Sequence, residues 1–201
     1  MHQENMSASK DLEYWEGMLH GDEKAFGNLY QLYFKLLYNY GRKICSDVSK
    51  VEDSIHDLFV DLWRYRYNLS STTSVRFYLY RSLRRRLVRD KDHTLSFSDD
   101  ESFFEGVLQL ASPSRESEII QHEATDSRVR QLKKLMNDLS PRQYEALVLF
   151  FYDEFSYSEI ASILDVNEQS ARNLVQRGLI HLREYGKHIV SLILFLLGFL
   201  A

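Results

Sequence analysis

The sequence predicts an all-helical protein made of two small domains. Apolar residues recur at three- and four-residue intervals through long segments, and the strict alternation typical of a half-buried strand is scarce. Only 2 prolines and 8 glycines interrupt the 201 residues. One tract, 92–127, is acidic, rich in serine and contains Pro113, so we interpret it as a linker between helical domains at 11–91 and 128–187.

The composition indicates a globular protein of a reducing compartment. Hydrophobic residues make up 44% and charged residues 27% of the chain, and the formal net charge is −4. The single cysteine, Cys45, cannot form an internal disulfide and supplies no cysteine cluster for a metal. Residues 1–17 lack the apolar core of a signal peptide, so we expect a cytoplasmic protein.

The first helix expected in the 11–91 domain lies within residues 22–44, and the second within 49–67. Along the first, an aromatic and aliphatic stripe at helical spacing should face the core: Phe26, Leu29, Tyr30, Tyr33, Leu36, Leu37 and Tyr40. Along the second, apolar side chains point mainly away from an acidic set at three- and four-residue spacing: Asp53, His56, Asp57 and Asp61. An acidic face suits a basic partner surface; a metal site or a plain solvated face are the alternatives.

The third helix, within 75–92, is strongly basic. Seven lysines and arginines against one aspartate give residues 71–91 a net charge of +6. Leu79, Leu83 and Leu87 should face the core, which leaves the arginines for phosphates and Tyr78 and Tyr80 for stacking on unpaired bases. A solvated basic face is the alternative. The polar loop "NLSSTTS" (68–74) precedes this helix.

The 128–187 domain shows the signals of a helix-turn-helix. Ser140 and Pro141 start one helix, and Ser156 with Glu159 forms a capping box that starts a short second one. Asp165 suits a left-handed turn residue, and Asn167 can cap the last helix. That helix buries one apolar face and turns outward a set suited to base edges and phosphates: Gln169, Ser170, Arg172, Asn173, Gln176 and Arg177. The alternative is a structural helical hairpin with a polar surface.

The linker and the C-terminal segment carry separate expectations. Nine acidic residues and one arginine give 92–127 a net charge of −8, so this segment can imitate nucleic acid and occupy a basic channel of a partner. The tail 188–201 is almost wholly apolar and is shorter than the roughly 20 residues of a membrane-spanning helix. We favour packing or partner docking for the tail over contact with a membrane surface.

Four segments in order resemble the extracytoplasmic-function (ECF) subgroup of the sigma-70 superfamily of bacterial RNA polymerase sigma factors. They are "GDEKAFGNLYQLY", "VEDSIHDLFVDLW", "VRFYLYRSLRRRLVRD" and the stretch from "LSPRQYEALVLFF" to "GLIHLRE". The resemblance implies two domains, region 2 and region 4, and no catalytic site, cofactor, metal or small-molecule substrate. It implies core RNA polymerase and promoter DNA as partners, and an anti-sigma factor as regulator. The rival interpretation is a helix-turn-helix regulator that is not a polymerase subunit.

The resemblance also implies a role for each residue set. Asp53, His56 and Asp57, with Asp61 on the same face, would bind the polymerase. Many ECF members carry Asn where Arg85 stands here. The set that would melt and read the −10 element is Asn68, Ser71, Thr72, Thr73, Arg76, Tyr78, Tyr80, Arg81, Arg84 and Arg85. The outward set of the last helix would read the −35 element.

Overall fold

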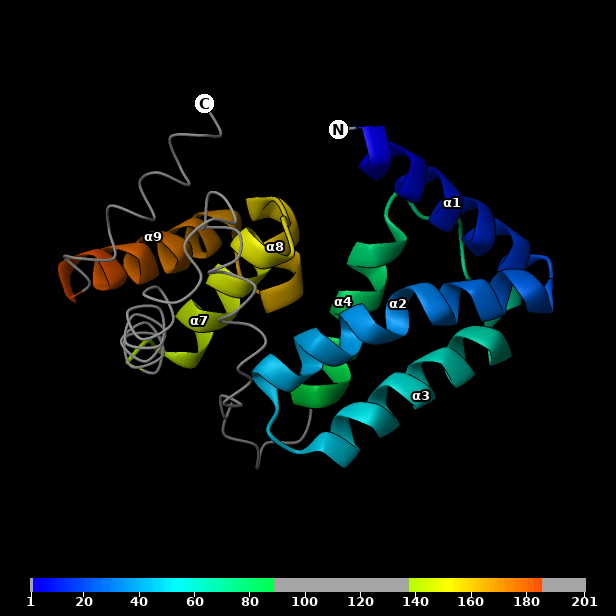
Figure 1. Ribbon diagram of the computed structural model, residues 1–201, viewed down its shortest axis with the longest axis horizontal. Coiled ribbons are helices and arrows are strands. Elements are labelled where there is room, and N and C mark those ends of the chain that lie inside the picture. Colours follow the sequence, from blue (N-terminus) through cyan, green and yellow to red (C-terminus); the bar gives the residue numbers. More distant parts are fainter. Residues whose placement is uncertain (1, 89–137, 186–201) are drawn as a thin grey trace, which may run out of the picture. The chain divides into compact units, whose positions relative to one another are not determined.

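A computed structural model describes residues 2–88 and 138–185, and every regular element within these ranges is helical (Figure 1). The chain divides into two compact units near residue 98. The predicted all-α architecture with two small domains is therefore confirmed. The predicted linker 92–127 and tail 188–201 lie outside the described residues.

The first unit is a bundle of four helices. α2 packs against α1, α3 and α4, while α4 also packs on α3, and a short 3-10 turn follows α3 (Figure 1). The elements are α1 (His2–Leu19), α2 (Glu23–Ile44), α3 (Val48–Arg64), η1 (Arg66–Asn68) and α4 (Val75–Val88).

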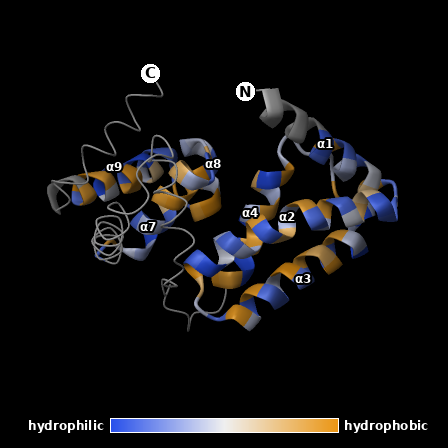
Figure 2. Ribbon diagram, in the orientation of Figure 1, coloured by the Kyte–Doolittle hydropathy of each residue, from blue (hydrophilic) through white to orange (hydrophobic). Residues whose placement is uncertain are grey.

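The predicted core of the first unit is largely confirmed. Leu29, Tyr33, Leu37 and Tyr40 of the α2 stripe are buried, and so are all three leucines of α4. Phe26 and Tyr30 are half-buried and belong to an aromatic cluster at the α2–α3 contact, where the Phe26 ring lies 5.0 Å from Trp63. Leu36 is half-buried as well. Figure 2 shows the resulting alternation of apolar and polar residues around α2 and α3.

Side-chain caps fix the starts of α2 and α3. Asp22 accepts hydrogen bonds from the backbone N–H groups of Lys24 (2.8 Å) and Ala25 (3.2 Å). Asp47 accepts one from the N–H of Lys50 at 3.0 Å. Such caps satisfy donors that have no partner within the first helical turn.

α1 is tied to the rest of the unit by two polar contacts. The buried Tyr33 hydroxyl of α2 donates a hydrogen bond to the Asp11 carboxylate, which is also buried. The Trp15 indole Nε1–H donates to the backbone oxygen of Ser70 at 3.2 Å. Because Ser70 lies in the loop before α4, α1 helps to hold that loop in place.

The second unit contains α7 (Pro141–Leu147), a π-helical turn η2 (Val148–Tyr152), α8 (Tyr157–Leu164) and α9 (Glu168–Tyr185). α9 packs on both α7 and α8. Ser140 and Ser156 each head a full capping box, with Gln143 and Glu159 respectively. The predicted helix starts are therefore confirmed.

The turn between α8 and α9 is as tight as predicted. Asp165 adopts the left-handed conformation, with φ 56 and ψ 54. The Asn167 side chain accepts a hydrogen bond from the Ser170 N–H at 2.7 Å and caps α9. α8 and α9 thus form the two helices of a helix-turn-helix.

Candidate functional site

Three of the four predicted positions on the acidic face of α3 are exposed, and the fourth, Asp61, is half-buried. Asp53, His56 and Asp57 are exposed, while Ile55 and Leu58 beside them are buried. Val60, 44% exposed, adds an apolar contact on this part of the helix. We call Asp53, His56, Asp57 and Val60 the α3 face.

Asp61 differs from the other three. One oxygen of its carboxylate lies 2.6 Å from Nη2 of Arg86, a residue of α4. The two side chains are 41% and 32% exposed respectively. Asp61 therefore braces α3 against α4 rather than standing free on the acidic face.

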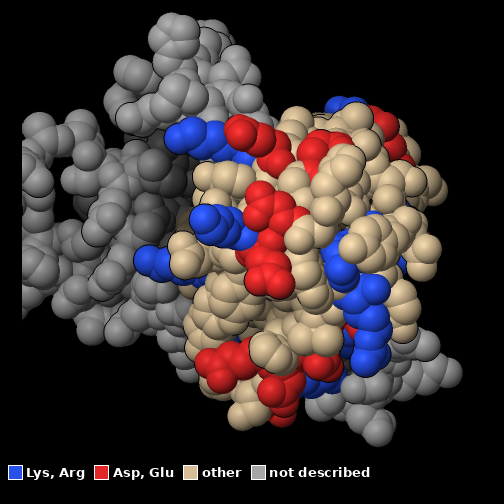
Figure 3. Space-filling view, turned by 90° about the vertical axis from the view of Figure 1, so that its right-hand side faces the viewer, with Lys and Arg blue, Asp and Glu red and all other residues tan. Residues whose placement is uncertain are grey.

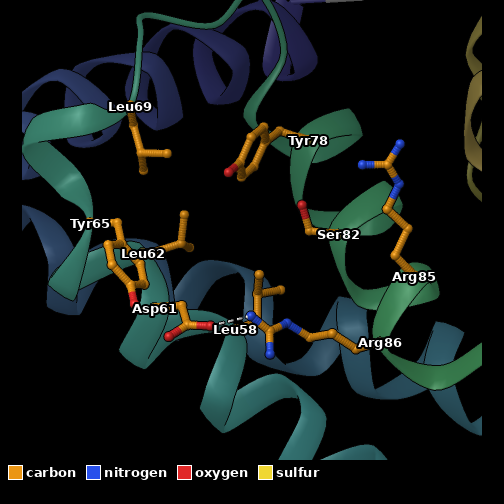
Figure 4. Close-up of a pocket in the computed structure, with 9 residues that line it drawn as sticks. All are labelled: Leu58, Asp61, Leu62, Tyr65, Leu69, Tyr78, Ser82, Arg85 and Arg86. Carbon is orange, nitrogen blue, oxygen red and sulfur yellow. Dashed lines mark hydrogen bonds and ion pairs between the residues drawn. The ribbon is translucent and has the colours of Figure 1, made fainter. Parts of the chain in front are cut away.

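The Asp61–Arg86 pair forms one side of a pocket of about 340 Å³ between α3 and α4 (Figure 4). Tyr78 and Ser82 of α4 point into it, and Leu69 covers it from the loop side. The nine lining residues are Leu58, Asp61, Leu62, Tyr65, Leu69, Tyr78, Ser82, Arg85 and Arg86. Aromatic rings beside hydroxyl and guanidinium donors can hold a flat polar group.

Tyr78 is held from behind by α1. The Trp15 ring meets it edge to face at a centroid distance of 5.0 Å. The same Trp15 binds the loop backbone through Ser70. Trp15 of α1 therefore positions both Tyr78, which lines the pocket, and the loop that borders the pocket.

The loop before α4 presents three of its predicted residues to solvent. Asn68, Ser71 and Thr73 are exposed, whereas Thr72 is half-buried. The Thr72 hydroxyl is bonded at 3.2 Å to both the N–H and the C=O of Ser74. Thr72 thus shapes the loop, while the exposed hydroxyls and the amide stay available to a ligand.

The predicted DNA-facing set on α4 needs two corrections. Tyr80 is 0% exposed, with its ring 4.8 Å from that of Tyr40, so it is a core residue and cannot stack on a base. Arg84 is also buried, at 6% exposure. Because α4 packs on α2 and on α3, the residues directly beside the leucine stripe are covered as well.

The other basic residues of α4 keep access to solvent. Arg85 is exposed, and Arg76 and Arg81 are half-buried. Arg76 also lies over the Tyr80 ring, 5.6 Å from its centroid. Arg89, the next basic residue, lies outside the described residues.

On α9, every predicted DNA-reading residue has solvent access. Gln169, Gln176 and Arg177 are exposed, and Ser170, Arg172 and Asn173 are half-buried. Two pairs are linked along the helix. Gln169 Nε2 donates to Asn173 Oδ1 at 3.0 Å, and Arg172 Nη2 pairs with Glu168 Oε1 at 3.3 Å.

The opposite side of α9 is packed on α7. Ala171, Val175 and Leu182 are buried, and Gly178 sits directly against Leu147. A Cβ at Gly178 would lie 2.8 Å from Leu147 Cδ1. The absence of a side chain at Gly178 therefore allows α9 to pack closely on α7.

Several residues of these sites were not predicted. Glu168 could have been found from its i, i+4 spacing to Arg172. Ser82, Arg86, Trp15 and Tyr157 could not, because their neighbours are distant in the sequence. Tyr157 matters most, since the Arg172 guanidinium lies 4.4 Å from the centroid of its ring.

Charge on the first unit is mixed rather than uniform on the face shown in Figure 3. Acidic side chains gather in the middle and along the lower edge of that face, and lysines and arginines flank them. A surface of mixed sign attracts a polyanion weakly. The face shown in Figure 3 is therefore poorly suited to hold nucleic acid by overall charge.

Across residues 2–88 and 138–185, no group of three or more His, Cys, Asp or Glu side chains is arranged to hold a metal ion. Within the same ranges, no helix is both long and apolar enough to cross a membrane.

Two family models match the chain. Residues 29–93 match "Sigma-70 region 2" and residues 129–182 match "Sigma-70, region 4". Together, and in this order, the two matches cover more than half of the sequence. None of the curated proteins compared with the chain matches it.

Solved structures with the same fold include CnrH in complex with the cytosolic domain of CnrY. The sequences are 16% identical, with a TM-score of 0.60, covering 89% of this chain and 98% of that one. Another is the sigma factor RpoE in complex with the anti-sigma factor NepR from Bartonella quintana, at 22% identity and a TM-score of 0.52, covering 82% and 98%. At such identities the likeness shows the fold alone.

Proposed function

The chain belongs to the sigma-70 family of RNA polymerase sigma factors, and we propose how its parts divide the task of directing the polymerase to promoters. Region 2 (11–91) binds the core enzyme and the −10 element, and region 4 (128–187) reads the −35 element. Two domains of this kind in this order are the arrangement expected of the ECF subgroup. The observation that carries the proposal is the pair of family matches, in order, on helices that present the α3 face, the pocket and the outward side of α9.

The α3 face is the proposed contact with core polymerase. Its acidic residues are exposed on a rigid helix, and Val60 supplies an apolar centre. Charged residues around an apolar contact steer association and select the partner. Asp61 is left out of this contact because Arg86 already holds it.

Region 2 is proposed to hold an unpaired −10 base in the pocket between α3 and α4. Tyr78 offers a ring for stacking, and Ser82 and Arg85 offer hydrogen-bond donors. Base stacking on an aromatic ring contributes about 1–3 kcal/mol in single-strand binders. Arg76 and Arg81, nearer the start of α4, would hold phosphates without reading sequence.

Region 4 is proposed to place α9 in the major groove. The exposed Gln176 and Arg177, with Gln169, Ser170, Arg172 and Asn173, can donate to base edges and phosphates. The firm packing of α9 on α7 through Gly178 would keep these side chains in register with the groove.

A protein inhibitor is the proposed regulator. CnrH was solved with CnrY, and RpoE with an anti-sigma factor, and both have the fold of this chain. An inhibitor that covered the α3 face would compete directly with polymerase. We also propose that the protein acts in the cytoplasm and has no catalytic chemistry of its own.

Run-off transcription tests the sigma-factor proposal. Core polymerase is incubated with the full chain and a pool of fragments from the protein's own genome, with the Asp53→Lys/Asp57→Lys variant as control. We expect promoter-dependent transcripts only with the unchanged chain. If both forms bind fragments but neither yields transcripts, a regulator that is not a polymerase subunit becomes the better assignment.

A further inference from the structure

Arg172 on the outward side of α9 is held from two directions. Its Nη2 lies 3.3 Å from Glu168 Oε1, one turn earlier on the same helix. Its guanidinium carbon lies 4.4 Å from the centroid of the Tyr157 ring, which belongs to α8. Arg172 is thus in contact with residues of both helices of the helix-turn-helix, Glu168 of α9 and Tyr157 of α8.

Tyr157 is itself firmly placed. It follows Ser156, whose capping box with Glu159 fixes the first turn of α8. Its ring stacks on Phe150 at 4.9 Å and an interplanar angle of 17°. Phe150 in turn meets Phe151 edge to face at 4.9 Å, so a column of rings runs from the π-helical turn to Arg172.

We propose that Tyr157 is a positioning residue that orients the Arg172 guanidinium for its contact with DNA. This inference rests on the proposed −35 reading by α9 and names a residue that acts on DNA through another side chain. It differs from a packing role because its effect passes through Arg172 alone.

The geometry explains why a ring suits this task. A guanidinium has five N–H donors in one plane, and stacking on a ring face uses none of them. Glu168 engages one edge, so the remaining donors can reach a guanine edge or a phosphate. An arginine held in its bound orientation loses less conformational entropy on binding DNA.

The ion pair with Glu168 is not enough to orient the Arg172 guanidinium. The Glu168 side chain is 55% exposed, so solvent and salt weaken its attraction to Arg172. A carboxylate close to phosphates is also repelled by them. The uncharged ring of Tyr157 keeps its hold on the guanidinium when the DNA backbone approaches.

The test uses holoenzyme assembled from core polymerase and the full chain. The probe is a pool of duplexes in which a central block is randomised, from which the unchanged holoenzyme selects its preferred sequence. The affinity for that sequence is then measured for Tyr157→Leu, Tyr157→Phe, Arg172→Ala and the double variant Tyr157→Leu/Arg172→Ala. Tyr152→Leu, a change at an exposed tyrosine of the π-helical turn, is the matched control.

We expect Tyr157→Leu to weaken the affinity for the selected DNA by about two- to fivefold, which is the effect of losing an exposed cation–π contact. Tyr157→Phe keeps the ring and should bind almost as tightly as the unchanged protein. In the Arg172→Ala background, Tyr157→Leu should have no further effect. Sequencing of the bound pool should show that Tyr157→Leu relaxes only the base positions that Arg172→Ala relaxes.

Additive losses in the double variant would overturn the inference, because Tyr157 would then act independently of Arg172. A Tyr157→Leu loss spread evenly over all positions, or matched by Tyr152→Leu, would overturn it as well. Failure of the proposed function looks different. In that case the unchanged holoenzyme selects no sequence from the pool.

Discussion

Glu154, between the π-helical turn and α8, holds a backbone conformation that favours glycine. Its φ is 50, and the side chain is exposed. A residue with a Cβ is strained there by about 1–2 kcal/mol, while glycine adds freedom mainly to the unfolded chain. We therefore expect Glu154→Gly to stabilise region 4 by about 0.5–1 kcal/mol, measured by hydrogen exchange of the α7 and α8 amides.

Two variants separate backbone strain from charge at this position. Glu154→Gln removes the charge but keeps the Cβ, so it should leave the exchange rates almost unchanged. Asp165→Gly should gain less than Glu154→Gly, because aspartate tolerates the left-handed region better than glutamate. An equal gain from Glu154→Gln would show that charge repulsion, and not φ, limits stability here.

The Tyr33–Asp11 contact should make region 2 sensitive to alkali. Burial raises the pKa of the Tyr33 hydroxyl, and the hydrogen bond and the charge of Asp11 raise it further, while Arg76 opposes them. The unfolded chain then loses this proton at a lower pH than the folded one. The stabilisation is full below the ordinary tyrosine pKa of about 10 and declines as the pH rises above it.

Tyr33→Phe tests this pH dependence by denaturant titration between pH 7 and 11. We expect a loss of about 1–3 kcal/mol at pH 7, since the buried Asp11 carboxylate loses its donor. The difference between variant and unchanged protein should shrink as the pH rises past 10. Tyr67→Phe, at a tyrosine that is 71% exposed, is the control, and an alkaline decline as steep in Tyr33→Phe as in the unchanged protein would contradict the assignment.

At the scale of single residues, the sequence predicted solvent exposure correctly on α3 but not everywhere on α4. The spacing of Asp53, His56 and Asp57 was enough to place them outside, because a helix with one buried stripe leaves those positions in solvent. The same reasoning misplaced Tyr80 and Arg84, since α4 is covered by two helices and its buried face is wider than one leucine stripe. The ion pair of Asp61 with Arg86 was not predicted, because Arg86 lies 25 residues further along the chain.

Two glycines of α2 offer a comparison within one helix. A Cβ at Gly27 would meet nothing within 4 Å, whereas one at Gly41 would lie 2.7 Å from Cγ1 of Val51 in α3. Alanine in a helix interior is favoured over glycine by about 0.5–1 kcal/mol. We expect Gly27→Ala to stabilise region 2 by that amount, and Gly41→Ala to destabilise it by about 1–3 kcal/mol through overpacking.

Thermal unfolding of the two glycine variants, followed by circular dichroism, checks this comparison. Restoring space with Val51→Ala should recover part of the Gly41→Ala loss, because the clash involves that side chain. If the Gly41→Ala variant were as stable as the Gly27→Ala variant, α2 and α3 could not approach as closely at Gly41 as described here.

Whole elements were predictable where short-range signals mark them. The caps at Ser140, Ser156 and Asn167 depend on hydrogen bonds that span three residues, so the sequence alone reveals them. The π-helical turn escaped, because its pattern of apolar residues is the same as that of an ordinary helix end. α1 was not singled out either, since contacts such as Trp15 with Tyr78 hold it in place from far along the chain.

At the scale of the whole molecule, charge is partitioned along the chain more than its total suggests. A net charge of +6 in residues 71–91 is followed by −8 in residues 92–127. The described part of the basic segment carries the α4 wall of the pocket, including Arg85 and Arg86. If α4 binds DNA as proposed, the acidic segment that follows it should offset nonspecific attraction to DNA until polymerase binds.

Reversing three charges in the acidic segment tests this idea. Asp99→Lys, Asp100→Lys and Glu101→Lys together lower the negative charge of 92–127 while leaving both sigma-70 regions intact. If the segment occupies a basic channel of polymerase, the triple variant should bind core enzyme more slowly, and most of all at low salt, where the Debye length exceeds 10 Å. The neutral variant Asp99→Asn/Asp100→Asn/Glu101→Gln should bind core enzyme at a rate between those of the unchanged protein and the triple lysine variant, because the effect follows charge.

Nonspecific DNA binding by the free protein should rise from the unchanged protein to the neutral variant and again to the triple lysine variant. Association rates and run-off yields that stay the same in all three forms would remove any role for these charges in initiation.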